Sequence, residues 1–268
     1  MQLSVFYDHI LNASKQTGKP LPSILEAVSA AGIQAVELDL HHFSEATDHL
    51  SLLKEAGLKL GCVNAFYEME HGFDEGRAME HIRCAVRCGA DRILVVPGFL
   101  SEEEGRRMAE VIHDTEAIQT FLEETPSAVS IASGLHKIVQ MAAVQGVTVT
   151  VEDFDNVTSP LSGLHSLLWY LDRVPGLSCT FDTGNFITHE DDLFEAWTLL
   201  RDRVDHVHCK DRGEGPVAIG DGHLPCGRIL ERIAADGYRG YVAIEHYGAS
   251  DQLDTILRSA AYLTALPF

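Results

Sequence analysis

The chain has 268 residues, of which 46% are hydrophobic and 22% are charged, as is typical of a folded globular domain rather than a disordered chain. Its 40 acidic residues outnumber the 20 basic ones, and the formal net charge of -20 opposes binding to nucleic acid, because such a field repels phosphates. The amino terminus lacks the pattern of a secretory signal and no apolar run is long enough to cross a membrane, so we expect a cytoplasmic protein with no membrane partner.

Short apolar segments alternate along the chain with longer segments whose apolar residues recur every three or four positions. The short segments predict eight strands, at 3–10, 35–40, 59–66, 91–98, 147–154, 177–184, 204–211 and 241–248. The helices predicted between and after them run from 21–32 to 251–266, and several close on a glycine. This alternation predicts a parallel sheet, and eight repeats favour a closed (β/α)8 TIM barrel over an open sheet. We predict one α/β domain over residues 1–268.

The segment 101–146 is too long for a single helix of such a barrel. It contains Pro126 and Gly134, so we predict two helices there, the first starting in the acidic run after Ser101. This extra helical segment could cover the barrel mouth or form a longer outer hairpin.

Four successive predicted strands end in a residue that can bind a metal ion. Glu152, Asp182, His208 and Glu245 each close an apolar segment, about one strand and helix after the previous one. The carboxyl ends of barrel strands converge on one mouth, so these side chains are expected to meet. Any one of them alone is better explained as a cap of the following helix. Together, three carboxylates and one imidazole predict one divalent metal ion, Mn²⁺ first, with Mg²⁺, Co²⁺ and Zn²⁺ also suited.

Five motifs indicate a family. They are VEDFDN at 151–156, FDTGN at 181–185, HVHCKD at 206–211, GDG at 220–222 and GYRGYVAIEHYG at 237–248. On these motifs the chain resembles the sugar phosphate isomerase/epimerase group. These are xylose isomerase-like barrels that include ketose 3-epimerases, hydroxypyruvate isomerase-like and inosose dehydratase-like proteins. The resemblance spans nearly the whole chain.

The resemblance implies a function in carbohydrate metabolism and a role for each of the four residues. All four would bind the metal, and Glu152 and Glu245 would also face opposite sides of a small sugar or sugar phosphate as acid and base. The implied reaction is isomerisation or epimerisation by removal of the proton alpha to a carbonyl, through a metal-stabilised enediolate.

Four further residues near these strand ends are predicted to contact substrate. His206 lies two positions before His208 on the same side of the strand, so it is expected behind the metal or in the core. Lys210 and Arg212 follow the strand and could hold hydroxyl, carboxylate or phosphate groups, or form a surface pair. Asn185 stands where many relatives have a histidine, which argues against a second metal but still allows a hydrogen bond to a hydroxyl.

Polar residues at the ends of the second and third predicted strands are interpreted differently. They could line the mouth, but each is better explained as solvated or structural; they are Glu37, His41, Asn64, Glu68 and His71.

Other functions remain open at this point. An inosose dehydratase-like lyase begins with the same proton abstraction. An endonuclease IV-like nuclease would need extra histidines, whereas the chain has Asn64, Pro97, Gly98 and Asn185 at the expected positions. A non-catalytic metal or sugar binding protein is the third alternative. The identity of the sugar and the oligomeric state, a homo-oligomer included, are left open.

Overall fold

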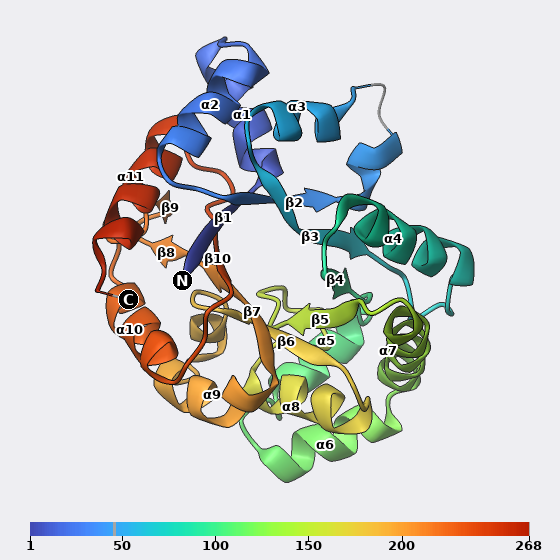
Figure 1. Ribbon diagram of the computed structural model, residues 1–268. Coiled ribbons are helices and arrows are strands. Elements are labelled where there is room, and N and C mark those ends of the chain that lie inside the picture. The colour runs from blue at the N-terminus through green and yellow to red at the C-terminus, as the bar shows by residue number, and fades with distance from the viewer. Residues whose placement is uncertain (45–46, 268) are drawn as a thin grey trace. The chain divides into compact units, whose positions relative to one another are not determined.

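The computed structural model describes residues 1–44 and 47–267. Within these ranges eight parallel strands form a closed barrel in the order β1-β10-β7-β6-β5-β4-β3-β2. The strands are β1 (Gln2–Phe6), β2 (Ala35–Asp39), β3 (Lys59–Phe66), β4 (Arg92–Val96), β5 (Thr148–Glu152), β6 (Ser178–Asp182), β7 (Val204–Cys209) and β10 (Tyr241–Ile244). Helices separate the strands along the chain (Figure 1), so the predicted (β/α)8 barrel is confirmed.

The helices follow the strands in the alternation that the sequence predicts. They are α1 (Tyr7–Thr17), α2 (Leu21–Ala30), α3 (His49–Glu55), α4 (Glu75–Cys88), α5 (Glu102–Ala109), α6 (Thr115–Glu124), α7 (Pro126–Val144), α8 (Leu164–Arg173), α9 (Leu193–Leu200), α10 (Cys226–Ala235) and α11 (Gln252–Ala265). Short 3-10 helices are η1 (Leu40–Ser44), η2 (Phe186–His189) and η3 (Arg201–Arg203). A small antiparallel hairpin, β8 (Asp211–Arg212) with β9 (Pro216–Val217), has no counterpart in the predicted elements.

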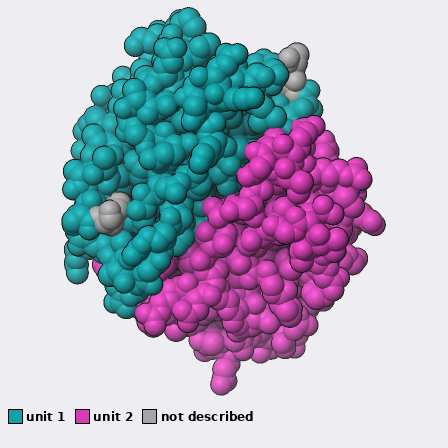
Figure 2. All heavy atoms as spheres, viewed as in Figure 1, with its two compact units in different colours: residues 1–63, 206–268 teal, residues 64–205 magenta. Residues whose placement is uncertain are grey.

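The chain divides into two compact units, which Figure 2 shows in different colours. Unit 1 comprises residues 1–63 and 206–268, and unit 2 comprises residues 64–205. Both ends of the chain therefore belong to unit 1. The expectation of a single domain over residues 1–268 stays a prediction.

In unit 1 the first strand pairs with the last one. β1 lies between β10 and β2, with Val5 opposite Ile244 and Phe6 opposite Glu37. Helices α1 and α11 pack against each other beside these strands (Figure 1). Val5, Ile244 and Ile256 of α11 are completely buried, and burying a side chain of this size contributes about 1.5–3 kcal/mol. The amino-terminal strand is thus held by the end of the chain.

The strand predicted over 3–10 is wrong in its second half, because α1 begins at Tyr7. A short apolar run of this kind is compatible with a buried strand and with a buried helix. In the structure Tyr7, Ile10 and Ala13 recur at helical spacing and are all buried. Gly18 ends the helix in the left-handed conformation with φ 67°, as glycine commonly does.

In unit 2 the register of neighbouring strands aligns the predicted ligands. β5 lies between β4 and β6, with Ile93 opposite Val149 and Glu152 opposite Thr180. Asp182 lies two residues beyond Thr180 and is the last residue of β6. Glu152 and Asp182 therefore come from the same end of two hydrogen-bonded strands.

The segment 101–146 contains three helices, α5, α6 and α7, where two were predicted. The predicted start is correct, because Ser101 and Glu104 form a capping box at the beginning of α5. The breaks lie at Asp114, which caps α6, and at Pro126, which begins α7. Gly134 does not interrupt α7. A Cβ there would lie 2.7 Å from the sulfur of Met69, so this glycine allows close packing.

Two further features of the described residues concern membrane spans and cysteines. No helix within residues 1–44 and 47–267 is long and apolar enough to cross a membrane. The six cysteines are free thiols, and all except the half-buried Cys88 are buried.

Candidate metal centre

The four predicted ligands lie where the sequence predicts them, at the carboxyl ends of strands. Glu152 and Asp182 end β5 and β6 in unit 2, whereas His208 lies near the end of β7 and Glu245 directly follows β10 in unit 1. All four are buried, with exposed fractions of 7%, 0%, 0% and 8%. Buried charged groups need partners. The neighbours of the two ligands in each unit therefore decide what these ligands can bind.

In unit 1 the imidazole of His208 lies between two carboxylates. Its Nε2 is 3.2 Å from Oε2 of Glu37, and its Nδ1 is 3.3 Å from Oε2 of Glu245. The ring of Phe6 packs edge-on against it at 5.0 Å. If Nε2 donates to Glu37, the lone pair of Nδ1 faces a second carboxylate, which is favourable only with a proton or cation between them. Metal-binding histidines commonly have this carboxylate behind the ring.

Glu37 is the centre of a buried hydrogen-bond network in unit 1. Its side chain is completely buried and accepts from the Ser4 hydroxyl at 3.1 Å and from Nε2 of His206 at 2.6 Å, besides its contact with His208. Burial alone would raise the pKa of Glu37, but His206 and His208 outweigh burial and hold the pKa below its ordinary value. Of the two interpretations made from sequence, solvated or structural, the structural one is correct.

His206 occupies the core position that the sequence predicts. Its side chain is completely buried, it contacts Glu37, and its ring packs edge-on against His208 with centroids 5.2 Å apart. One potential ligand atom of each of Glu37, His206 and His208 lies within 4.8 Å of the others. A contact of His206 with substrate stays a prediction.

Lys210 is an ion-pair partner of the predicted base rather than a surface residue. Its Nζ lies 2.6 Å from Oε1 of Glu245, and its side chain is only 14% exposed. Burial raises the pKa of Glu245, but Lys210 and His208 outweigh burial, and the pKa lies below its ordinary value. Glu245 is therefore ionised at neutral pH.

Arg212 lies in the β8–β9 hairpin and is half-buried. The preceding Asp211 is buried and accepts backbone hydrogen bonds from Gly220, Gly222 and Leu224. A Cβ on Gly222 would lie 2.1 Å from the Asp211 carboxylate, so the glycine is needed for this close approach. The GDG motif at 220–222 thus lies between β9 and α10 and packs on Asp211. A contact of Arg212 with substrate stays a prediction.

In unit 2 backbone groups fix the carboxylate of Asp182. Its Oδ1 accepts from the backbone N–H of Gly184 at 2.6 Å and from that of Asn185 at 2.8 Å. The FDTGN motif therefore turns back on its own aspartate directly after the strand. The side-chain amide of Asn185 is buried and donates to the backbone carbonyl of Asp153, and its contact with substrate stays a prediction.

Asp153, next to the predicted ligand Glu152, was not singled out from the sequence. It is completely buried, and its Oδ1 accepts from the backbone N–H of Gly163 at 3.0 Å. Burial raises the pKa of Asp153 well above its ordinary value despite that hydrogen bond, and the nearby carboxylates of Asp182, Asp191 and Glu152 raise it further. The only sequence signal was a second acid beside Glu152.

Three phenylalanines of unit 2 lie at or just beyond the ends of neighbouring strands: Phe66 ends β3, Phe99 follows β4 and Phe154 follows β5. The ring of Phe154 lies 6.2 Å from that of Phe66 and 6.0 Å from that of Phe99, measured between centroids. Phe66 is 48% exposed. An exposed aromatic surface beside the strand ends can cover the C–H face of a small ligand.

Comparisons with known proteins agree with the geometry of the fold. Residues 25–266 match the family model described as xylose isomerase-like TIM barrel. No match to the sequence of a curated protein was found.

Solved structures of enzymes share the fold at low identity. The probable 3-DHS dehydratase AsbF from Bacillus anthracis matches with a TM-score of 0.74 and 15% identity, over 100% of both chains. A sugar phosphate isomerase/epimerase from Parabacteroides distasonis matches with a TM-score of 0.74 and 15% identity, over 99% of this chain and 96% of that one. The D-allulose 3-epimerase of Methylomonas sp., in complex with D-allulose, matches with a TM-score of 0.73 and 13% identity, over 100% of this chain and 97% of the other.

Proposed function

We propose that this chain, which belongs to the xylose isomerase-like TIM barrel family, is a divalent-metal-dependent isomerase or epimerase of a sugar or sugar phosphate. The observation that carries the proposal is the position of His208 between Glu37 and Glu245. An imidazole oriented by one buried carboxylate and facing another is arranged to bind a cation. A purely structural histidine needs only the first of these contacts.

The proposed ligands are Glu152, Asp182, His208 and Glu245. They lie at or next to the carboxyl ends of four strands that are consecutive in the barrel order, β5, β6, β7 and β10. The donor set of three carboxylates and one imidazole fits Mn²⁺ best and also accepts Mg²⁺, Co²⁺ or Zn²⁺. When bound, such an ion polarises a carbonyl oxygen and stabilises the negative charge that develops on it.

The proposed acid and base are Glu152 and Glu245. Glu245 is ionised because Lys210 and His208 outweigh the effect of burial on its pKa, so it can accept the proton of the carbon alpha to the carbonyl. Glu152 would hold or return a proton on the opposite face, and two such faces are what epimerisation requires. Lys210, already 2.6 Å from Glu245, would orient that carboxylate and hold a substrate oxygen.

The proposed substrate is a small sugar. The aromatic surface of Phe66, Phe99 and Phe154 suits the apolar face of a sugar ring or chain. Two of the similar structures are a sugar phosphate isomerase/epimerase and an epimerase in complex with D-allulose. Asn185, Arg212 and His206 remain proposed substrate contacts.

A dehydratase is the second candidate. The structure of a probable 3-DHS dehydratase is as similar in fold as that of the isomerase/epimerase, with a TM-score of 0.74 for each. Loss of water beta to a carbonyl begins with the same proton abstraction, and the two reactions differ only in the later steps, in which a proton returns or a hydroxyl group leaves.

One experiment separates these functions. Protein loaded with Mn²⁺ is incubated in D₂O with ketoses, aldoses, inososes and hydroxypyruvate, and the products are followed by proton NMR. An isomerase or epimerase places deuterium on the carbon alpha to the carbonyl and gives a rearranged or inverted sugar. A dehydratase gives an unsaturated product. If no substrate gives either deuterium incorporation or an unsaturated product, the proposal is contradicted. This is the result expected of a nuclease or of a non-catalytic binding protein. The same screen without metal is the control.

A further inference from the structure

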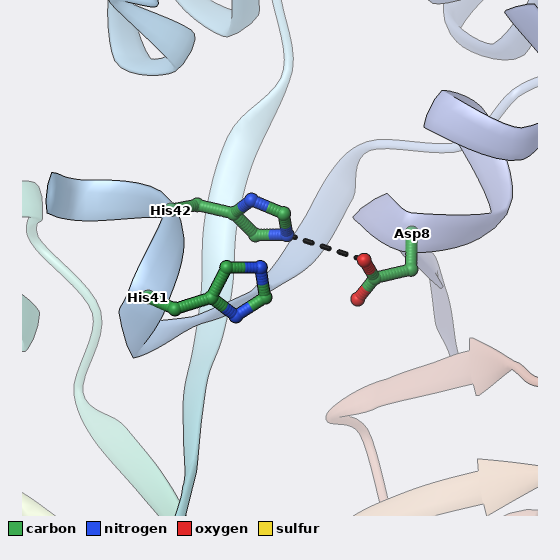
Figure 3. Close-up of side chains that lie close together, drawn as sticks. All are labelled: Asp8, His41 and His42. Carbon is green, nitrogen blue, oxygen red and sulfur yellow. Dashed lines mark hydrogen bonds and ion pairs between the residues drawn. The ribbon is translucent and has the colours of Figure 1, made fainter. Parts of the chain in front are cut away.

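Another group of side chains of types that can ligate a metal lies in unit 1 and shares no residue with the centre proposed above. Asp8 is in the first turn of α1, directly after β1, and His41 and His42 are in η1, directly after β2. Because β1 and β2 are paired strands, their carboxyl ends bring these side chains together (Figure 3). One potential ligand atom of each residue lies within 4.8 Å of the others.

His42 is the buried member of this Asp8–His41–His42 cluster. Its side chain is 2% exposed, and its Nε2 lies 3.2 Å from Oδ1 of Asp8. The rings of Tyr7 and His49 pack edge-on against it, with centroids 5.5 Å and 5.4 Å away. The orientation of this imidazole is therefore set by packing, with Nε2 directed at the carboxylate.

His41 is held in place by a second carboxylate. Its Nδ1 lies 2.6 Å from Oδ1 of Asp39, and its backbone N–H donates to the same oxygen at 2.8 Å. The other ring nitrogen is on the side of His42 and Asp8 (Figure 3). A carboxylate that orients the imidazole of a metal-binding histidine is the usual outer partner in zinc sites.

The spacing of the donors fits a small ion. Ligands of tetrahedral Zn²⁺ lie about 2.0–2.2 Å from the metal, and thus roughly 3.4 Å from one another. Asp8 and His42 are already at this separation, with 3.2 Å between the donor atoms. The side chains of Asp8 and His41 are 29% and 57% exposed, so the site is open to solvent and water can complete the coordination.

We infer that Asp8, His41 and His42 bind a late first-row divalent transition metal, Zn²⁺ first. Two imidazoles and one carboxylate favour Zn²⁺, Co²⁺, Ni²⁺ or Cu²⁺ over Mg²⁺ and Ca²⁺, which prefer all-oxygen sites. The ion takes the place of the hydrogen between His42 and Asp8 and links the first turn of α1 to η1. The alternative is that the His42–Asp8 hydrogen bond and the neighbouring His41 bind no metal.

The test counts Zn²⁺ bound by tag-free protein after equilibrium dialysis, measured by elemental analysis. The natural chain should bind two ions, and Asp182→Ala, which removes a ligand of the proposed catalytic centre, should bind one. Adding His41→Ala or Asp8→Asn to Asp182→Ala should abolish that remaining ion. Asp39→Asn should weaken it about 10–100-fold, as loss of an outer carboxylate does. Circular dichroism checks that each variant is folded, and Asp8→Asn keeps the shape of the side chain.

A control variant and a second measurement test whether the bound ion lies at the Asp8–His41–His42 cluster. His71→Ala removes a histidine that is 78% exposed and lies outside the cluster, so it should leave the count unchanged. Co²⁺ bound to the Asp182→Ala variant should give visible absorption bands that His41→Ala removes. An unchanged count in both His41→Ala and Asp8→Asn, or no Zn²⁺ bound by Asp182→Ala, would overturn the inference. A catalytic centre that binds no metal would appear instead as equal counts in the natural chain and Asp182→Ala.

Discussion

The substitution Glu37→Gln tests the role of the carboxylate behind His208. The natural side chain accepts hydrogen bonds from Nε2 of both His206 and His208. A glutamine of the same size has one acceptor oxygen and one donor NH₂ group. One of the two imidazoles must therefore face the NH₂ group of the glutamine, or change its tautomer so that this nitrogen accepts. In His208 the change of tautomer would place the proton on Nδ1, the nitrogen that faces Glu245 and the proposed metal.

The expected loss follows from these contacts. Removal of an outer carboxylate from a metal-binding histidine weakens metal binding about 10–100-fold, which is roughly 1.4–2.7 kcal/mol. The metal-free protein should also lose about 1.5–3 kcal/mol of unfolding free energy, because a buried hydrogen bond to a charged group is lost.

Two measurements check this prediction. Titration with Mn²⁺ gives the affinity, and urea unfolding of the metal-free protein gives the stability. Ser4→Ala is the control, because it removes the third contact to Glu37, at 3.1 Å, and leaves both imidazole contacts in place. Its Mn²⁺ affinity should stay close to that of the natural chain. An unchanged Mn²⁺ affinity in Glu37→Gln would refute the proposal that Glu37 orients a metal ligand.

Three further predictions concern the proposed centre and the buried histidines. Asp182→Ala should lose the catalytic ion but stay folded, as elemental analysis and circular dichroism would show, and Mn²⁺ should no longer raise its melting temperature. Glu152→Gln and Glu245→Gln should each lower turnover by about 10²–10⁴-fold when loaded with metal, and one of them should still exchange substrate hydrogen with D₂O without inverting the centre. Normal turnover in either would exclude the acid–base pair. Burial lowers the pKa of His9 to about 3 and that of His246 to about 4. Below the ordinary histidine pKa, both side chains therefore bind a proton in the unfolded chain but stay neutral in the folded protein. The free energy of unfolding should fall as the pH drops from the ordinary histidine pKa toward these values, by up to about 1.4 kcal/mol per pH unit for each histidine. A urea midpoint that does not change across this range would contradict the conclusion that both histidines stay neutral in the folded protein.

The sequence was most informative where hydrophobic periodicity and strand position agree. The eight strands were predicted because apolar runs recur between helical patterns, and the structure shortens most of them at the carboxyl end. Glu152, Asp182, His208 and Glu245 stood out because each closes such a run. Their joint binding of one ion stays a prediction.

Other features depend on contacts that a single sequence does not show. Glu37 lies on β2, yet its partners His206 and His208 lie on β7, far away in the chain. The only sequence signal for the burial of Glu37 is its place inside an apolar strand. The burial of Lys210 against Glu245 depends on a similar long-range contact. The error at Tyr7 has another origin, because a short apolar run does not decide between helix and strand.

The make-up of unit 1 has a consequence for synthesis on the ribosome. Unit 2 ends at residue 205, so all of its residues are made before those of β10. β1 precedes unit 2 in the sequence, but its partner β10 (Tyr241–Ile244) follows unit 2. Domains generally fold as units while the chain emerges, and contacts between distant residues form slowly. One edge of β1 therefore stays unpaired until unit 2 and β10 have both been made, and an unpaired strand edge is open to pairing with another chain.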